Sequence, residues 1–445
     1  MCGAKIPEDA GCGERKSGNG PNANLVSCVM PSYQPRVVDD AINRALRSVG
    51  GVLLEGARAV GKTTTGLFHA ASSVRLDSDP NLMQLATLEP AAVLAGAVPR
   101  LIDEWQLAPP IWTAVRHEID RRGTPGQFLL AGSSSPADDV TRHSGAGRII
   151  RVRMRTLSLW ESGESSGLVS LAALLEGADM AAGLADLTVS DYARVIARGG
   201  WPLLVRNPNA DISQVLSSYV RDVARTDLKG NGVERDPIRV EALLRALARN
   251  VTTEASLASL GREAGGDTPL DQKTVTNYVS DLQRIFVLEE QPAWAAHLRS
   301  KVRQRVAPKW HFVDPSLAAV LLGANENRLV ADLKSLGLHF ESLVIRDLRV
   351  YAAANGASVF HYRDETGLEI DAIIETLDGR WLACEVKLGG EEAVNVAARN
   401  LQALRDKVKD EQRSRLAGLV VVTAGKVALT RPDGVHVVPL GCLKP

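Results

Sequence analysis

Short, continuously apolar runs separated by helically spaced apolar positions fill the first third of the chain. Val52 to Leu54 is such a run, and unbroken apolar runs are typical of parallel strands buried on both faces. Between the runs, positions such as Val38, Ile42 and Leu46 recur every three or four residues and predict an amphipathic helix. We therefore expect an α/β core with a parallel sheet. Its expected strands are 52–54, 74–77, 100–104, 127–134 and 149–155.

The pattern changes after this core. From Glu161 to about Pro237 the spacing is mostly helical, and residues 237–310 predict three helices followed by a two-stranded wing. The expected helices are 238–248, 256–264 and 271–285, and the expected wing strands are 286–289 and 303–310. Beyond a periodic helix at 340–350, two alternating runs at 367–375 and 381–388 flank Asp378-Gly379 and predict a β-hairpin.

These changes divide the chain into a tail and four domains. A chain of 445 residues is too long for one hydrophobic core. The first segment is rich in Gly, Asn, Ser and Pro and has no apolar period, so we expect it to be disordered; Met30 is a conceivable start. The expected divisions are a tail (1–33), an α/β core (34–160), a helical lid (161–236), a winged helix (237–310) and a C-terminal α/β domain (311–445).

Composition narrows the class without identifying a function. Apolar residues make up 45% of the chain and charged residues 23%, and no apolar run approaches the roughly 18 residues of a membrane span. The formal net charge is zero, so any nucleic-acid binding must depend on local patches. The five cysteines form no C-x-x-C pair, and the first residues lack a secretory pattern. We expect a cytoplasmic protein with no membrane partner.

The strongest motif is Gly-x-x-x-x-Gly-Lys-Thr, formed by Gly56, Gly61, Lys62 and Thr63 between a predicted strand and a predicted helix. Glycines let successive amide groups face phosphate oxygens, the lysine reaches the β- and γ-phosphates, and the threonine hydroxyl binds Mg²⁺. A glycine-rich turn before a lysine-bearing helix is the alternative. The expected nucleotide-contacting residues are Gly56, Ala57, Arg58, Ala59, Val60, Gly61, Lys62, Thr63 and Thr64.

Two carboxylates follow the third predicted strand. Asp103 and Glu104 end the apolar run Leu101-Ile102, about 40 residues after the motif. In a P-loop protein the first such carboxylate holds Mg²⁺ and the second polarises the attacking water. We expect Asp103 to contribute to the metal site and Glu104 to be catalytic. A solvated Asp-Glu dipeptide would look the same in isolation.

Three further positions are candidates for contacts with the nucleotide. Ser133 and Ser134 follow the fourth predicted strand, where a parallel sheet presents its ligand, or else form an ordinary serine-rich turn. Arg148 precedes the fifth strand, and its side chain either reaches the nucleotide of a neighbouring subunit or is a simple surface cation. Arg142 is the second candidate for that arginine. The fifth strand also alternates Arg151, Arg153 and Arg155 on one face.

Taken in order, these motifs resemble a prokaryotic AAA-type ATPase that carries a C-terminal domain of unknown function. The residues that carry the resemblance extend from the P-loop to Asp314: Leu101 to Gln106, Gly147-Arg148, Leu157 to Glu161, Tyr219, Arg225 to Leu228, Thr274 to Tyr278 and Pro308 to Asp314. The resemblance implies sheet order 5-1-4-3-2, ATP hydrolysis with Mg²⁺ and a homo-oligomer. Trp105 departs from the usual small aliphatic residue.

The C-terminal hairpin brings a second set of charged residues together. Matching the apolar faces requires a three-residue loop, Asp378 to Arg380, or a bulge, and that register places Asp371 across from Lys387 and beside Glu385. Asp-x(n)-Glu-x-Lys resembles the restriction-endonuclease-like superfamily. This implies that Asp371 and Glu385 bind Mg²⁺ and that Lys387 assists catalysis, with Glu341 and Gln402 nearby. A surface hairpin with a cross-strand ion pair is the alternative.

The leading hypothesis is an ATPase that couples nucleotide hydrolysis to a DNA-directed C-terminal module. Five basic residues and no acidic one lie between Trp294 and Trp310, and they could meet DNA phosphates or form a solvated edge. A Mg²⁺-dependent nuclease regulated by ATP and a nucleotide-gated scaffold with negligible turnover are the alternatives.

Overall fold

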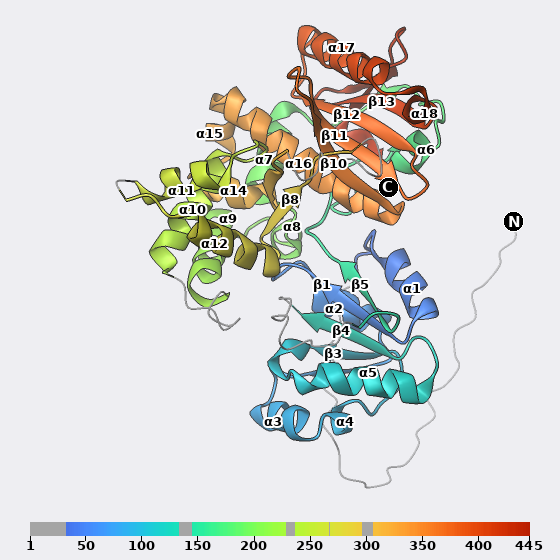
Figure 1. Ribbon diagram of the computed structural model, residues 1–445, viewed down its shortest axis with the longest axis vertical. Coiled ribbons are helices and arrows are strands. Elements are labelled where there is room, and N and C mark those ends of the chain that lie inside the picture. Colours follow the sequence, from blue (N-terminus) through green and yellow to red (C-terminus); the bar gives the residue numbers. More distant parts are fainter. Residues whose placement is uncertain (1–32, 133–144, 228–235, 267, 296–305) are drawn as a thin grey trace, which may run out of the picture. The chain divides into compact units, whose positions relative to one another are not determined.

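A five-stranded parallel sheet forms the core of the N-terminal half in the computed structural model (Figure 1). The structure describes residues 33–132, 145–227, 236–266, 268–295 and 306–445. The sheet strands, in spatial order, are β2 (Ser72–Arg75), β3 (Arg100–Asp103), β4 (Phe128–Gly132), β1 (Gly51–Glu55) and β5 (Ile149–Arg153). This order, 5-1-4-3-2 from the other edge, confirms the prediction and is that of a P-loop NTPase fold.

Helices cover both faces of this sheet because alternate strand residues point to opposite sides. On one face, Val52 and Leu54 pack with Ile42 of α1 (Asp39–Ser48). On the other face, Leu53 and Leu130 pack in a cluster with residues of α3, α4 and α5. The helices of the core are α1, α2 (Lys62–His69), α3 (Pro80–Leu88), α4 (Pro90–Val93) and α5 (Pro110–Arg122), with a 3₁₀ turn at Trp105–Leu107.

The middle of the chain is helical and ends in a small antiparallel sheet. Its helices are α7 (Val189–Arg198), α8 (Pro202–Arg206), α9 (Ile212–Asp222) with a π-helical turn Val223–Asp227, α10 (Pro237–Arg249), α11 (Leu257–Gly265), α12 (Gln272–Arg284), α14 (Pro315–Leu321) and α15 (Glu326–Ala331). Strand β8 (Leu288–Gln291) pairs with β9 (Lys309–Phe312). Both strands begin and end later in the chain than the predicted wing strands. The observed ladder runs from the pair Leu288 and Phe312 to the pair Gln291 and Lys309.

The C-terminal sheet is sandwiched between two long helices (Figure 1). Helix α16 (Leu333–Ala354) packs on one face, against residues such as Leu382 and Val420, and α17 (Glu391–Lys407) packs on the other, against residues such as Ala383 and Val421. The strands, in spatial order, are β10 (Ala357–Arg363), β11 (Glu369–Thr376), β12 (Trp381–Lys387), β13 (Leu416–Thr423), β15 (His436–Pro439), β14 (Val427–Thr430) and β7 (Gly183–Leu184). Helix α18 (Asp410–Arg413) precedes β13.

Part of the expected lid belongs to this C-terminal layer. Strand β7 extends the seven-stranded sheet beside β14, and β6 (Val169–Ser170) pairs with β16 (Leu443–Lys444). Helix α6 (Leu171–Leu175) buries its leucines in the same cluster as α16. The prediction of one helical lid over 161–236 is therefore wrong for its first 25 or so residues. Local spacing cannot show that a short segment pairs with strands more than 200 residues later.

The hairpin between β11 and β12 has a different register from the expected one. Its three-residue loop is Leu377 to Gly379, because Thr376 N–H donates to the Arg380 carbonyl (2.9 Å). Gly379 takes the left-handed conformation that such a loop requires (φ 84°). Ala372 therefore pairs with Cys384, whereas the expected register, with Asp371 across from Lys387, would pair Ala372 with Val386.

A bulge in the neighbouring β10–β11 ladder changes the expected faces as well. The register shifts between Phe360 and Tyr362, and as a result Ile370 packs on the α17 side whereas Ile374 packs on the α16 side. The prediction that these two residues share a face is wrong, since a bulge reverses the alternation beyond it.

Among the described residues, no helix combines the length and the apolar character needed to cross a membrane.

One buried carboxylate joins three of these elements. Glu289 on β8 accepts hydrogen bonds from Arg153 and Arg155 at the end of β5 and from Arg349 on α16, at 2.8 to 3.3 Å. Burial favours the neutral acid, but the charges of the three guanidinium groups outweigh it and hold the pKa of Glu289 well below its usual range. The Glu289 carboxylate is therefore charged, and both of its oxygens accept hydrogen bonds from guanidinium groups.

We expect Glu289→Gln to destabilise the chain by about 3–5 kcal/mol, because three largely buried guanidinium groups would lose their common anion. Chemical denaturation monitored by circular dichroism measures this loss. Glu290→Gln, at the exposed neighbouring position, is the matched control and should unfold like the unsubstituted chain. Equal midpoints for all three proteins would show that Glu289 does not join the elements.

Candidate functional site

The P-loop motif forms the turn between β1 and α2, at the carboxyl edge of the parallel sheet. Gly61 has φ 100°, a left-handed value that strains other residues, and it caps the amino end of α2. A Cβ atom at Gly56 would lie 2.3 Å from the carbonyl oxygen of Met154, so only glycine fits there. The helix N-terminus and the turn provide the setting in which backbone amides bind phosphate.

Lys62 is folded back onto this turn. Its Nζ donates hydrogen bonds to the carbonyl oxygens of Gly56 (2.8 Å) and Ala57 (2.7 Å). Burial lowers the pKa of Lys62 to about 8, although the nearby carboxylates of Glu104 and Asp103 favour the charged form. An ammonium group that is hydrogen-bonded to neutral carbonyl oxygens becomes more stable when an anion enters the turn.

Thr63 and Asp103 meet across the sheet edge. Thr63 Oγ1 donates to Asp103 Oδ2 at 2.9 Å, and Asp103 is the last residue of β3. Burial raises the pKa of Asp103, while Thr63 and Arg75 oppose this rise. A hydroxyl and a carboxylate oxygen are ligands that Mg²⁺ accepts together with phosphate oxygens. The described residues contain no group of three or more His, Cys, Asp or Glu side chains that could hold a metal unaided. The two side chains fit a magnesium ion that a bound nucleotide completes.

Glu104 lies directly after Asp103 in a left-handed conformation (φ 54°) that is uncommon for glutamate. Its carboxylate accepts a hydrogen bond from Gln106 Nε2. Trp105, the departure noted in the sequence, is buried beside β4 and lies against Trp112. Strained backbone of this kind concentrates at functional sites, because the neighbouring structure must hold it in place.

Of the remaining candidates for nucleotide contact, three lie outside the described residues and one lies far from the P-loop. Ser133, Ser134 and Arg142 lie outside the described residues, and β4 ends at Gly132, beside Glu55 of β1. Arg148 precedes the amino end of β5, where its carbonyl accepts from Gly51 N–H, and its side chain pairs with Asp120 (2.6 Å) at the surface. The P-loop begins at the other end of these strands, roughly 16 Å away for a five-residue strand. Arg148 therefore does not reach the P-loop of its own chain.

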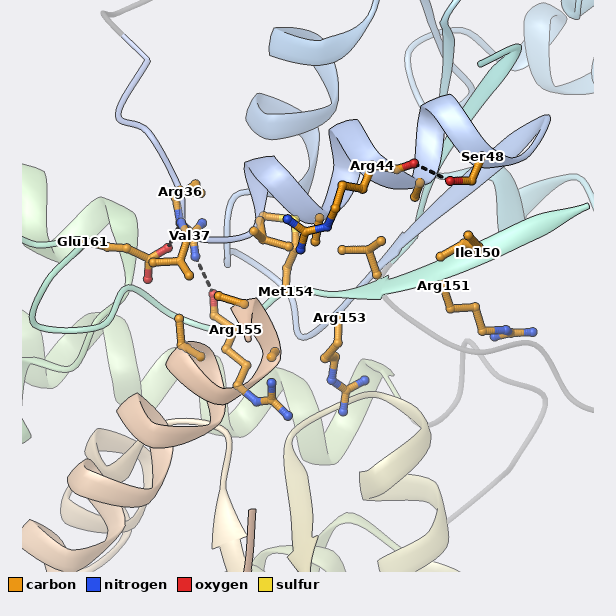
Figure 2. Close-up of a pocket in the computed structure, with 17 residues that line it drawn as sticks. Arg36, Val37, Arg44, Ser48, Ile150, Arg151, Arg153, Met154, Arg155 and Glu161 are labelled. Carbon is orange, nitrogen blue, oxygen red and sulfur yellow. Dashed lines mark hydrogen bonds and ion pairs between the residues drawn. The ribbon is translucent and has the colours of Figure 1, made fainter. Parts of the chain in front are cut away.

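Sequence reasoning missed Arg36, which lies beside Glu161 (Figure 2) and whose side chain is hydrogen-bonded to the backbone of the P-loop. Its guanidinium donates to the carbonyl oxygen of Val60 (2.9 Å), to the carbonyl oxygen of Arg155 (2.8 Å) and to Glu161 Oε1 (2.8 Å). Glu161 also accepts hydrogen bonds from Ser158. A lone arginine before a helix carries no local signal, and its partners lie more than 100 residues away in the chain, apart from Val60.

A cavity of about 440 Å³ lies beside β5. Arg151 and Arg153 of that strand and Arg155, just after it, are among its lining residues (Figure 2). Residues of α1 and the end of α16 form its other walls. No residue from Gly56 to Thr63 lines it, so it is not the phosphate site. These three arginines already form ion pairs. Arg153 and Arg155 pair with Glu289, and Arg151 pairs with Glu55 (3.2 Å).

The C-terminal candidates line a separate cavity of about 380 Å³. Lys387 Nζ lies 2.6 Å from Glu385 Oε2 and 3.4 Å from Asp371 Oδ2, and Glu341 of α16 faces the same space. Asn400, and not Gln402, donates to Glu385 Oε1 (3.1 Å). Gln402 does not line the cavity, because on α17 it lies two positions, or about 200°, from Asn400.

Sequence reasoning also missed the second lysine of this cavity. Lys309, expected on a basic wing, is 2% exposed and points among Glu341, Glu369 and Asp371. Burial and the Asp371 charge raise the pKa of Glu341 to about 8 and that of Glu385 to about 7. The other four basic residues of that stretch, Arg299, Lys301, Arg303 and Arg305, lie outside the described residues.

Comparison with known families supports an AAA-type ATPase domain. Residues 50–162 match a family model described as "AAA domain". Residues 189–328 match "Domain of unknown function (DUF8612)", and residues 336–443 match "Domain of unknown function (DUF4143)". Each model covers less than a third of the chain.

Two curated relatives resemble most of the chain. "Uncharacterized protein Rv2008c" of Mycobacterium tuberculosis is 26% identical over 419 residues, which covers 93% of this chain and 85% of the relative. "Uncharacterized protein Mb2031c" of Mycobacterium bovis has the same identity and coverage.

Three solved structures resemble the chain at low similarity. The Walker-type ATPase PABY2304 of Pyrococcus abyssi has a TM-score of 0.38 and 14% identity, covering 64% of this chain and 94% of that one. AMPPCP-bound DnaA from Aquifex aeolicus has a TM-score of 0.26 and 13% identity, covering 56% and 86%. Aeropyrum pernix ORC1 in complex with DNA has a TM-score of 0.26 and 10% identity, covering 69% and 97%.

The lowered pKa of Lys62 predicts that binding of a triphosphate takes up a proton at pH 9. The free lysine, with a pKa of about 8, is mostly neutral there, and bound phosphates favour its charged form. We expect an uptake approaching one proton, and an affinity that falls about tenfold per pH unit above 8. Calorimetry with a non-hydrolysable ATP analogue in buffers of different ionisation enthalpy measures this uptake. Lys62→Arg, whose guanidinium stays charged, should take up none; equal uptake in both proteins would contradict the assignment.

Proposed function

We propose that the chain is a Mg²⁺-dependent ATPase that works as a homo-oligomer in the cytoplasm and directs its C-terminal half to DNA. The observation that carries the ATPase proposal is the 2.9 Å hydrogen bond from Thr63 to Asp103, beside Lys62 at the carboxyl edge of the sheet. This arrangement supports a triphosphate with its metal at that edge.

Each residue of this edge has a distinct role in the proposed reaction. The turn from Gly56 to Thr63 wraps the phosphates, and Lys62 releases the Gly56 and Ala57 carbonyls to contact the β- and γ-phosphates. Thr63 and, through water, Asp103 would hold magnesium, which would supply neutralisation of the phosphate charge. Glu104 orients and polarises the attacking water. Arg36 keeps the Val60 carbonyl, and with it the turn, in place.

The DNA-directed part of the proposal has separate support. Helices α10, α11 and α12 followed by paired β8 and β9 have the element order of a winged helix. Four basic residues and no acidic one lie between these strands in the sequence, where they would meet phosphates.

ATPase turnover with and without double-stranded DNA, at two salt concentrations, tests this part. Turnover that does not respond to DNA at low salt would remove DNA from the proposal.

We expect Glu104→Gln to lower ATP hydrolysis by roughly 10²–10⁴-fold while ATP affinity changes little, because the amide cannot act as a base. Steady-state phosphate release and equilibrium nucleotide binding measure the two effects. Glu89→Gln, at an exposed glutamate of the same core, is the control and should hydrolyse normally. A wild-type protein that binds ATP but turns it over no faster than Glu104→Gln would instead favour the scaffold alternative.

We expect Arg148→Ala to lower turnover by about 10³–10⁵-fold if the side chain completes a neighbouring subunit's site. Mixing Arg148→Ala with Glu104→Gln should then restore part of the activity, because one variant keeps its P-loop chemistry and the other provides the arginine. Arg121→Ala, at an exposed arginine paired with Glu118, is the control. Mixtures no more active than the sum of the separate variants would contradict a role between subunits.

A further inference from the structure

A buried ammonium group lies where the C-terminal carboxylates converge. Lys309 Nζ is 2.7 Å from Glu369 Oε1, 3.2 Å from Glu341 Oε1 and 3.8 Å from Asp371 Oδ1. The side chain comes from β9, outside the C-terminal sheet, and is 2% exposed. Carboxylates this close offset the cost of burying the charge of a lysine.

The carboxylates that the nuclease resemblance assigns to Mg²⁺ already face the ammonium groups of Lys309 and Lys387. Asp371 Oδ2 accepts from Val386 N–H (2.8 Å) and faces Lys387 Nζ (3.4 Å), while Oδ1 faces Lys309. Glu385 Oε2 accepts from Lys387 and Oε1 from Asn400. No metal-holding cluster of three His, Cys, Asp or Glu residues occurs in the described part of the chain. A resident divalent cation therefore does not fit this arrangement.

We propose that Lys309 is an internal cation that takes the place of a divalent metal in the C-terminal site, so that the intact chain keeps this site metal-free. The proposal concerns the C-terminal half alone and does not depend on ATP hydrolysis.

The charges around the cavity support this assignment. Five carboxyl groups line the cavity with three cationic side chains; the acids are Glu254, Glu341, Glu369, Asp371 and Glu385, and the cations are Lys309, Lys387 and Arg363. Burial opposes the charge on Lys309, but Glu341, Asp371 and Glu369 outweigh burial and raise its pKa, so the side chain remains an ammonium ion. Removing that charge leaves a buried excess of negative charge, which a divalent cation would neutralise.

The middle of the chain contributes part of the cavity wall. Thr252, Thr253 and Glu254, from the connection between α10 and α11, line the same space. Arg363 of β10 pairs with Glu254 (3.1 Å) across it. Residues from the middle of the chain therefore line this open cavity together with Lys309, so the buried cation and part of the wall come from outside the C-terminal sheet.

Titration of the nucleotide-free full-length chain with MnCl₂, followed by calorimetry and by electron paramagnetic resonance of free Mn²⁺, tests the proposal. We expect wild type and Asp371→Asn to bind Mn²⁺ equally, with no site that depends on Asp371. Lys309→Met should gain one site at least tenfold tighter than any wild-type site, and Lys309→Met/Asp371→Asn should lose that gain. A folded Lys309→Met protein with no new site would overturn the proposal.

The wild-type comparison keeps the test decisive if Lys309→Met does not fold. A Mn²⁺ site in the wild-type chain that Asp371→Asn abolishes would show that the metal binds with Lys309 in place, and would overturn the proposal without any substitution at Lys309. Equal binding by the two proteins supports it. Lys309→Gln, which keeps a hydrogen-bond donor but no charge, is the second variant and should gain the same site.

Discussion

The ion pairs of Glu289 are the interaction on which the joining of the two halves depends. Arg153 and Arg155 extend from the end of the strand next to β1, and Arg349 extends from the main helix of the C-terminal half. A buried carboxylate and buried guanidinium groups are each costly alone, so the cluster is stable only when all parts are in place. The strand beside the P-loop is thereby tied to β8 and α16.

A second buried network strengthens the same junction. Arg346 of α16 pairs with Asp314 (3.1 Å) and Asp347 (2.7 Å), and Asp347 accepts from the backbone N–H of Leu159 (3.0 Å). On the other side of Glu289, β8 pairs with β9 so that Gln291 lies opposite Lys309. A continuous chain of contacts therefore connects the carboxyl edge of the nucleotide-binding sheet with the lysine in the C-terminal site.

Two buried lysines illustrate how environment decides what the same side chain does. Lys62 donates to the neutral carbonyl oxygens of Gly56 and Ala57, and burial lowers its pKa to about 8, so an anion that enters the turn can pair with its charge. Lys309 contacts carboxylates that outweigh burial and raise its pKa. The first lysine is suited to receiving a ligand, whereas the charge of the second is already satisfied inside the protein.

The sequence by itself determined the order of the core elements and the candidate residues of the P-loop, since both depend on neighbours within a few positions of the chain. The family resemblance implied the strand order that the structure confirms, and Gly56 to Gly61 form the turn that leads into α2 at Lys62. Only the tertiary structure decided the hairpin register and the pairing of β6 and β7 with strands far along the chain. It also decided that Lys309 lies among carboxylates. These outcomes depend on burial and on charges brought together by packing, and no local pattern encodes either of them.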